Sequence, residues 1–506
     1  MLFNSFSFLL AFLPVTLLGY FWLARRDPAW GIAWLALASL FFYGWWDVRY
    51  VPLLLASISA NYGCAQAIRR AQGRARNWWL GGALAANLVL LGYYKYANFF
   101  YTSLTGEQSA MLQVVLPIGI SFFTFTQIAF LVDTARGFVQ EGRFVHYLLF
   151  VTYFPHLVAG PVLHHKEMMP QFADARNALP RADNFSVGAT IFIIGLAKKI
   201  LLADSLAPYA NLLFNAPGEP TLLAAWGGVL AYTFQLYFDF SGYSDMAIGL
   251  SRMFGIHLPL NFNSPYKSLN MVEFWRRWHM TLSRFLRDYL YIPLGGNRRG
   301  PLRAKINLML TMVLGGLWHG ASWNFVVWGA LHGLYLVLAH LWQMVRARLG
   351  WQGGSRAGRL AAWALTFVAV VFAWVFFRAA DLPSALRIVA GMLGQHGVAL
   401  PDAIGVRLGA LQAALERLGV TWSLGGGSQF VETWGWVTLA ALVAFLMPNT
   451  QQIMHRFAPA LDHDGSAAPA RLSWFPSQGS ALASGLLAVL CLLALARPSE
   501  FLYFQF

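Results

Sequence analysis

The amino-acid sequence predicts an all-α protein that crosses a membrane many times. Hydrophobic residues make up 58% of the 506 residues and charged residues only 11%, whereas a soluble domain carries roughly 25% charged residues. The 21 tryptophans and 19 tyrosines suit the aromatic belts found at membrane interfaces. Apolar stretches of spanning length recur along the chain, so we expect roughly 11–13 transmembrane or re-entrant helices in a single integral-membrane domain over residues 1–506.

The predicted spans follow one another along the whole sequence. Residues 6–23 are apolar, with no basic residue before them and with Arg25 and Arg26 after them. This pattern favours a retained first helix with its N-terminus outside over a cleaved signal peptide. The basic loops at 69–76 and 136–143 then fall on the cytoplasmic side. The further spans are residues 29–46, 51–68, 78–94, 112–132, 146–162, 187–202, 222–240, 306–317, 323–345, 360–377, 434–446 and 481–495.

Three polar segments interrupt these spans. Residues 381–432 are predicted to form an extramembrane loop with surface helices, one of them amphipathic at 403–418. Residues 447–478 are polar and contain several prolines, which is typical of a connector. Residues 261–305 carry nine lysines or arginines against two acids, with aromatic residues between them at close to helical spacing. We expect this basic segment to lie in, or re-enter from, the cytoplasmic interface.

The net charge of +15 does not indicate nucleic-acid binding. The basic residues cluster in short loops between apolar segments, which is typical of cytoplasmic loops that contact anionic lipid. The two cysteines, Cys64 and Cys491, lie in apolar stretches, and neither a disulfide framework nor a metal site is predicted.

Two histidines are the main candidates for chemistry. His319 lies in an apolar stretch, 306–341, that contains no Lys, Arg, Asp or Glu. An ionisable group is expensive in a membrane, so it is by default a candidate functional residue. His279 lies in the basic segment beside Arg276 and Arg277, which favour its neutral form; an interfacial histidine that hydrogen-bonds a neighbour is the alternative.

Several blocks of sequence form a recognisable pattern. They are MLFNS at 1–5, YFPHLVAGP at 153–161, YFDFSGYSD at 237–245, NFNSPY at 261–266, FWRRWH at 274–279, YIPLGGNR at 291–298, WHG at 318–320 and FLYFQF at 501–506. In this order they make the chain similar to the membrane-bound O-acyltransferase (MBOAT) family, and within it to the bacterial alginate O-acetyltransferase group.

The resemblance implies a ring of tilted helices around a central tunnel in the bacterial inner membrane. It also implies transfer of acetyl from cytoplasmic acetyl-CoA, with no bound cofactor, to periplasmic SGNH-like acetyltransferase partners that modify a polysaccharide. An alginate-type exopolysaccharide is expected; cellulose and peptidoglycan are alternatives. The family's catalytic histidine matches His319, and a second polar position, His or Asn in the wider family, matches His279.

The residue chemistry agrees with this assignment. A hydroxyl attacks a thioester poorly unless a base removes its proton, as neutral His319 could do. His279 could orient the acceptor or stabilise the oxyanion. Candidate substrate-binding residues are Arg276, Arg277, Trp278, Trp318, Asn324 and His332.

Other polar residues, and one other function, are weighed against these. Arg298 and Arg299 could meet CoA phosphates, or be ordinary cytoplasmic charges. Structural roles are expected for Asp239 and Asp245, and His164 and His165 are expected in a solvated turn. The competing function is a non-catalytic transporter in which His319 relays protons.

Overall fold

The computed structural model describes residues 1–106, 115–139, 142–158, 160–350, 354–461, 472–497, 499–500 and 502. Among these residues, six helices are long and apolar enough to cross a membrane: Ser7–Ala24, Val48–Arg70, Ala182–Phe214, Trp323–Arg348, Arg356–Arg378 and Gly427–Leu446. Shorter apolar helices are Pro28–Gly44, Ile120–Ala135, Leu382–Met392 and Gln478–Ala494. The chain is therefore an all-α, multi-pass membrane protein. The total of roughly 11–13 spans and the single domain stay predictions.

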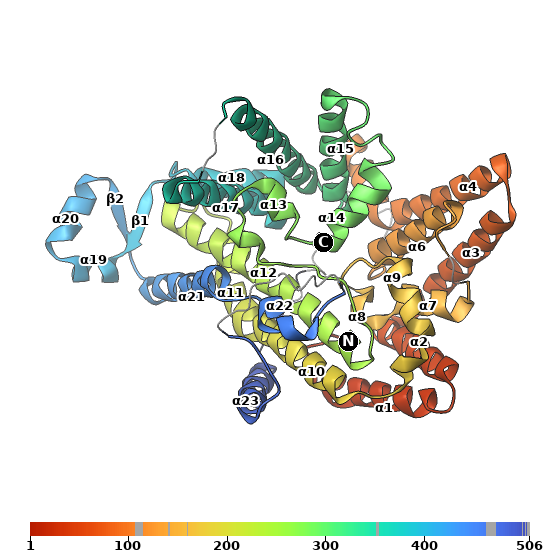
Figure 1. Ribbon diagram of the computed structural model, residues 1–506. Helices are drawn as coiled ribbons and strands as arrows, with labels where there is room; N and C mark the ends of the chain where they lie inside the picture. The colour runs from red at the N-terminus through yellow and green to blue at the C-terminus, as the bar shows by residue number, and fades with distance from the viewer. Residues whose placement is uncertain are drawn as a thin grey trace. The chain divides into compact units, whose positions relative to one another are not determined.

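The chain forms two compact units, and the first comprises Met1–Ala197, Ser241–Asn261 and Pro448–Arg497. Its α3, α4 and α6 pack against one another (Figure 1). The side-chain amides of Asn61 on α3 and Asn87 on α4 exchange buried hydrogen bonds of 3.2 and 2.6 Å, which join the two helices as such amides do between membrane helices. The helices of this unit are α1 (Leu13–Ala24), α2 (Pro28–Gly44), α3 (Val51–Arg70), α4 (Gly73–Leu91), α5 (Ala97–Thr105), α6 (Ile120–Ala135), α7 (Phe144–Thr152), α8 (Phe154–Leu157), α9 (His165–Ala173), α10 (Ala182–Ala197), α22 (Thr450–Ile453) and α23 (Gln478–Ala494).

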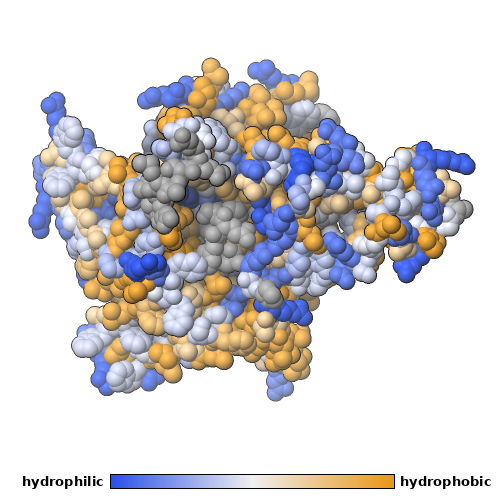
Figure 2. All heavy atoms as spheres, turned by 180° about the vertical axis from the view of Figure 1, so that it is seen from behind, coloured by the Kyte–Doolittle hydropathy of each residue, from blue (hydrophilic) through white to orange (hydrophobic). Residues whose placement is uncertain are grey.

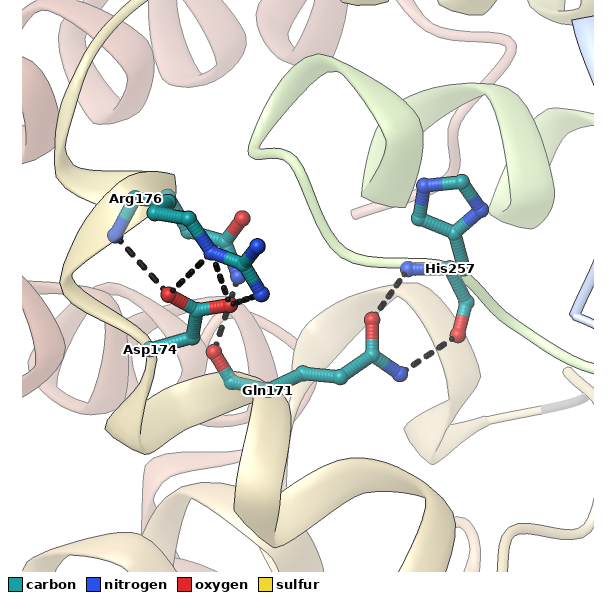
Figure 3. Close-up of polar contacts among 5 residues, drawn as sticks. Gln171, Asp174, Arg176 and His257 are labelled. Atoms are coloured by element: carbon teal, nitrogen blue, oxygen red, sulfur yellow. Dashed lines mark hydrogen bonds and ion pairs between the residues drawn. The ribbon is translucent and has the colours of Figure 1, made fainter.

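A side-chain clamp joins α9 to the segment that follows α12 (Leu222–Met253) in this unit. The Gln171 amide donates to the carbonyl of His257 at 3.0 Å and accepts from its backbone N–H at 2.8 Å (Figure 3). Beside this clamp, Arg176 and Asp174 form an ion pair of 2.7 Å at the surface.

Two predictions for this unit are wrong. The span predicted at 146–162 is broken, because α7 ends at Thr152 and the short α8 restarts with Pro155 in its first turn, where proline is tolerated. The turn predicted to expose His164 and His165 is buried, with exposed fractions of 3% and 4%. His165 stays there because its Nε2 lies 3.1 Å from the carboxylate of Asp133.

Some predicted features lie outside the described residues. They are Ala159, the beginning of the span at 112–114, part of the connector at 462–471, and residues 501 and 503–506 of the closing block.

The second unit comprises Lys198–Phe240, Phe262–Met447 and Pro498–Phe506, so α12 contributes to both units. The basic segment 261–305 folds here as short helices and turns rather than as one long helix. The elements of this unit are α11 (Asp204–Phe214), α13 (Met271–Trp275), α14 (Met280–Leu286), α15 (Pro301–His319), α16 (Trp323–Arg348), α17 (Arg356–Arg378), α18 (Leu382–Met392), β1 (Val398–Pro401), α19 (Asp402–Leu408), α20 (Ala410–Arg417), β2 (Val420–Ser423) and α21 (Gly427–Leu446).

A small lobe of β1, α19, α20 and β2 lies between α18 and α21 in the chain (Figure 1). Its strands pair in parallel, with Val398 opposite Val420, and the sequence did not predict them. The single amphipathic helix predicted at 403–418 is also wrong. It divides at Gly409, whose positive φ of 54° is incompatible with a right-handed helix and is readily adopted by glycine.

Apolar side chains are exposed along the candidate spans. Leu18, Leu365 and Leu439 are examples, and Figure 2 shows apolar residues over much of the face it draws. Such surfaces are typical of helices that contact lipid.

A buried ion-pair network lies inside the second unit. The Lys199 ammonium lies 2.6 Å from Asp204 and 2.7 Å from Asp239, and it donates to the backbone carbonyl of Glu500. The Asn211 amide donates to the Glu500 carboxylate at 2.7 Å and accepts from Arg378 at 2.9 Å. The network therefore joins Glu500 to the end of α17, and Asp239 takes part in it as a partner of Lys199.

Replacing Lys199 with methionine should destabilise the protein strongly, because two buried carboxylates would lose their cation. Removing one partner of a buried ion pair costs about 3–5 kcal/mol, so thermal unfolding in detergent should begin at a clearly lower temperature.

The matched control for this experiment is Arg176→Met. The Arg176–Asp174 pair has the same 2.7 Å separation but an arginine side chain that is 88% exposed, against 2% for Lys199. Exposed pairs contribute little, so this variant should unfold like the wild type. Equal shifts in both variants would contradict the prediction.

Candidate active site

The site is held by close contact between α15 and α16 in the second unit (Figure 1). Three glycines allow this contact. A Cβ atom added at Gly316 would collide with the carbonyl oxygen of Phe325, and one at Gly329 with that of Met312. At Gly333 it would meet the sulfur of Met309. Small residues at facing positions let two membrane helices approach backbone to backbone.

His319 is the last residue of α15, and aromatic rings surround it. Its ring centroid lies 4.9 Å from Trp318, 5.1 Å from Trp328 and 5.1 Å from Phe377. Gly320 follows it in extended conformation, and a Cβ atom there would collide with the ring of Phe325. His319 therefore stands at a helix end, partly exposed, with a fixed aromatic surround.

His279 lies close to His319, with 6.5 Å between the two ring centroids. It precedes α14 with φ 43° and ψ 52°, a left-handed conformation that is uncommon for residues other than glycine, although His is among the residues enriched there. Strained backbone of this kind is concentrated at functional sites.

The His279 imidazole is buried and uncharged. Its ring packs edge-on against Phe240 at 4.8 Å, and burial lowers the pKa of His279 to about 3. The neutral form was predicted from the neighbouring arginines. Burial is the cause in the structure, while Arg276 is exposed and Arg277 forms an ion pair with Glu273 at 2.7 Å.

The other predicted site residues divide into two groups. Trp318 contacts both histidines, and His332 lies 4.7 Å from Trp328. Trp278 is buried as well, and its ring centroid lies 4.9 Å from that of Trp374.

Asn324 and the arginines stand apart from this cluster. The Asn324 amide donates to the carbonyl of Ala379 at 2.8 Å and so joins α16 to the end of α17. Arg298 and Arg299, like Arg276, are exposed. Binding roles for these residues stay predictions.

Sequence reasoning missed the aromatic residues that enclose the histidines. Phe240, Trp328, Trp374 and Phe377 come from three different helices. Aromatic residues are frequent throughout this chain, so their identity alone carried no signal. One feature of the sequence could have indicated part of this enclosure. Trp328 lies four residues before His332, so the two side chains share a helix face.

The arrangement is suited to proton transfer. Two imidazoles face the same aromatic surround, and neutral imidazole is the side chain that most readily takes or gives a proton near pH 7. The rings around the buried His279 limit water, which strengthens any hydrogen bond that its imidazole makes.

Comparison with known proteins identifies related sequences. The model of "MBOAT, membrane-bound O-acyltransferase family" matches residues 83–379, a range that contains all the predicted site residues. The chain is 45% identical over 431 residues to the peptidoglycan O-acetyltransferase of Helicobacter pylori, an alignment covering 79% of this chain and 81% of that protein. It is 43% identical over 425 residues to the probable alginate O-acetylase AlgI of Azotobacter vinelandii, with 82% of each chain covered. Similarity to the teichoic acid D-alanyltransferase of Bacillus subtilis is lower, at 27% over 270 residues, covering 51% and 68%.

The variant Gly329→Ala should destabilise the site through the contact between α15 and α16. Its added methyl group would force the helices apart at the Met312 carbonyl, and overpacking of this kind costs about 1–3 kcal/mol. We expect a lower unfolding temperature in detergent.

Gly435→Ala is the control for this variant, because Gly435 lies exposed on α21 with no atom within 4 Å of the added Cβ. It should unfold no earlier than the wild type. If Gly329→Ala also unfolds no earlier than the wild type, the packing argument is wrong.

Proposed function

The chain belongs to the membrane-bound O-acyltransferase family, and we propose that it passes acetyl from cytoplasmic acetyl-CoA to a hydroxyl on the periplasmic side of the bacterial inner membrane. It is a membrane-embedded acyltransferase, and its relatives are named as O-acetyltransferases of polysaccharides. The observation that carries the proposal is the pair His319 and His279, 6.5 Å apart and enclosed by aromatic rings.

In the proposed reaction His319 is the general base. One of its imidazole nitrogens takes the hydroxyl proton as the acceptor oxygen bonds to the thioester carbonyl carbon. The C–S bond then breaks, and the departing thiolate recovers the proton from the imidazolium.

His279 has the complementary role. A neutral imidazole keeps one N–H, and a donor aimed at the developing oxyanion stabilises the tetrahedral intermediate. The lowered pKa of His279, about 3, supports this role, because the ring stays a neutral donor at neutral pH.

The exposed arginines are proposed to meet the nucleotide end of acetyl-CoA. Arg276, Arg298 and Arg299 are exposed in the basic segment 261–305, which by the positive-inside rule faces the cytoplasm. Guanidinium groups bind phosphate well, and the same charges would hold the segment against anionic lipid.

The proposed acceptor is a periplasmic SGNH-like acetyltransferase that delivers acetyl to an alginate-type exopolysaccharide. Peptidoglycan is the second candidate, because a relative named for it is 45% identical, slightly above the 43% of the relative named for alginate. The two acceptor polysaccharides are separated by assays with the cognate partner. The labelled acetyl group should appear either on alginate oligosaccharides or on peptidoglycan glycan strands.

The direct test is release of CoA from labelled acetyl-CoA by purified protein with its periplasmic partner. Loss of a general base lowers the rate about 10²–10⁴-fold. In His319→Ala the rate of CoA release should therefore fall by about a hundredfold or more. His340→Ala, an exposed histidine on α16, should keep wild-type activity.

Two outcomes would refute this function. Equal release of CoA by wild type and His319→Ala would exclude His319 as the base. Solute flux through reconstituted protein without acetyl-CoA would favour the transporter alternative, in which His319 relays protons.

A further inference from the structure

His332 is a buried histidine near the candidate site that the proposed reaction does not use. It lies on α16, its exposed fraction is 0%, and the rings around it are all aromatic and uncharged. The ring centroid distances are 4.7 Å to Trp328, 5.2 Å to Trp275, 5.8 Å to Tyr335, 6.0 Å to Trp374 and 6.1 Å to Phe274.

The side-chain nitrogens of His332, Trp275 and Trp328 have no hydrogen-bond partner among the described residues. In the part of the chain that the structure describes, neither ring nitrogen of His332 makes a hydrogen bond. The buried indole N–H groups of Trp275 and Trp328 also donate to nothing. Unmade hydrogen bonds are costly in a protein interior, and buried polar groups nearly always find partners. Three such side chains on α13 and α16 therefore indicate a polar group that binds among them.

The cluster adjoins the catalytic histidine through one shared ring. The Trp328 indole contacts His319 at 5.1 Å and His332 at 4.7 Å. A molecule that places its reacting carbon beside His319 can therefore reach His332 with a group a few bonds away.

The available atoms define the chemistry of that group. A neutral imidazole offers one donor and one acceptor, and each indole offers one donor. An amide has the matching pair, an N–H and a carbonyl oxygen. The aromatic walls suit methylene groups, and they provide no countercharge for a phosphate or a carboxylate.

We propose that His332, Trp275 and Trp328 bind an amide of the pantetheine arm of the acyl donor, with the thioester beside His319. In acetyl-CoA two methylene groups separate the thioester sulfur from the first amide. This inference rests on the proposed acetyl-CoA donor and adds a binding subsite to it.

The test compares two small donors that differ only in the amide. S-acetyl-N-acetylcysteamine keeps the thioester and the first amide, and S-pentyl thioacetate replaces the amide by a hydrocarbon of the same length. KM and kcat are measured for both with the purified protein and its acceptor partner. In His332→Phe the KM for the amide donor should rise about tenfold, the value of one hydrogen-bonded pair, while the KM for S-pentyl thioacetate should not change.

Three further variants separate binding from structural damage. His332→Asn keeps one donor and one acceptor, so it should recover most of the preference for the amide donor. Trp275→Phe removes a single N–H and should lower that preference by a smaller factor, which keeps the test decisive if His332→Phe fails to fold. His340→Phe makes the same substitution at an exposed position of the same helix and should leave both KM values unchanged.

The outcomes distinguish this inference from the function it rests on. In one outcome the wild type releases CoA from acetyl-CoA, while His332→Phe and Trp275→Phe change the KM values of both small donors equally, or change neither. In that case the amide subsite is wrong and the acyltransferase proposal stands. If the wild type does not release CoA from acetyl-CoA, the donor proposal fails and the subsite fails with it.

Discussion

The geometry of the candidate site depends on the backbone contact between α15 and α16. Gly316, Gly329 and Gly333 remove the side chains that would keep these helices apart. His319 ends one helix, and Trp328 and His332 stand on the other, so this contact sets the spacing among them. In a membrane the hydrophobic effect does not drive helices together, and packing of small residues takes its place.

The second unit contains charge in two different settings. Lys199 is buried but paired with Asp204 and Asp239. In the basic segment, by contrast, Arg276, Arg298 and Arg299 are exposed and Arg277 is paired with Glu273. The rings in contact with the histidines are aromatic and carry no charge. A neutral surround favours proton transfer between neutral groups over binding of ions.

Composition and apolar spacing predicted most of the fold. The all-α class and the positions of the long apolar helices follow from runs of apolar residues of spanning length. Short helices such as α5, α9 and α22 were not predicted. Errors arose where a long-range partner decides the outcome. His165 is buried because Asp133 lies beside it, and a parallel strand pair joins segments 22 residues apart, as Val398 opposite Val420 shows. Neither partner can be read from local sequence.

The candidate site was predicted in part. His319 could be singled out because an imidazole in an apolar stretch is unusual. His279 was a candidate because of its place in the basic segment, and the resemblance to a family matched both histidines. Their closeness, across forty positions of sequence, is a result of folding. The enclosing rings of Phe377 and Trp374 could not be distinguished from the many other aromatic residues of the chain, because packing alone selects them.

The left-handed backbone at His279 bears on how this position can evolve. With φ at 43°, residues with branched or bulky side chains are disfavoured whatever their chemistry, and Asn, Asp, His and Gly are the tolerated types. The wider family is expected to carry His or Asn here, and both fall within that steric set. Recurrence of these two residues among homologues would therefore be selected by the shape of the main chain as well as by the reaction. A polar residue at this position is weaker evidence of catalysis than the same residue on a regular helix.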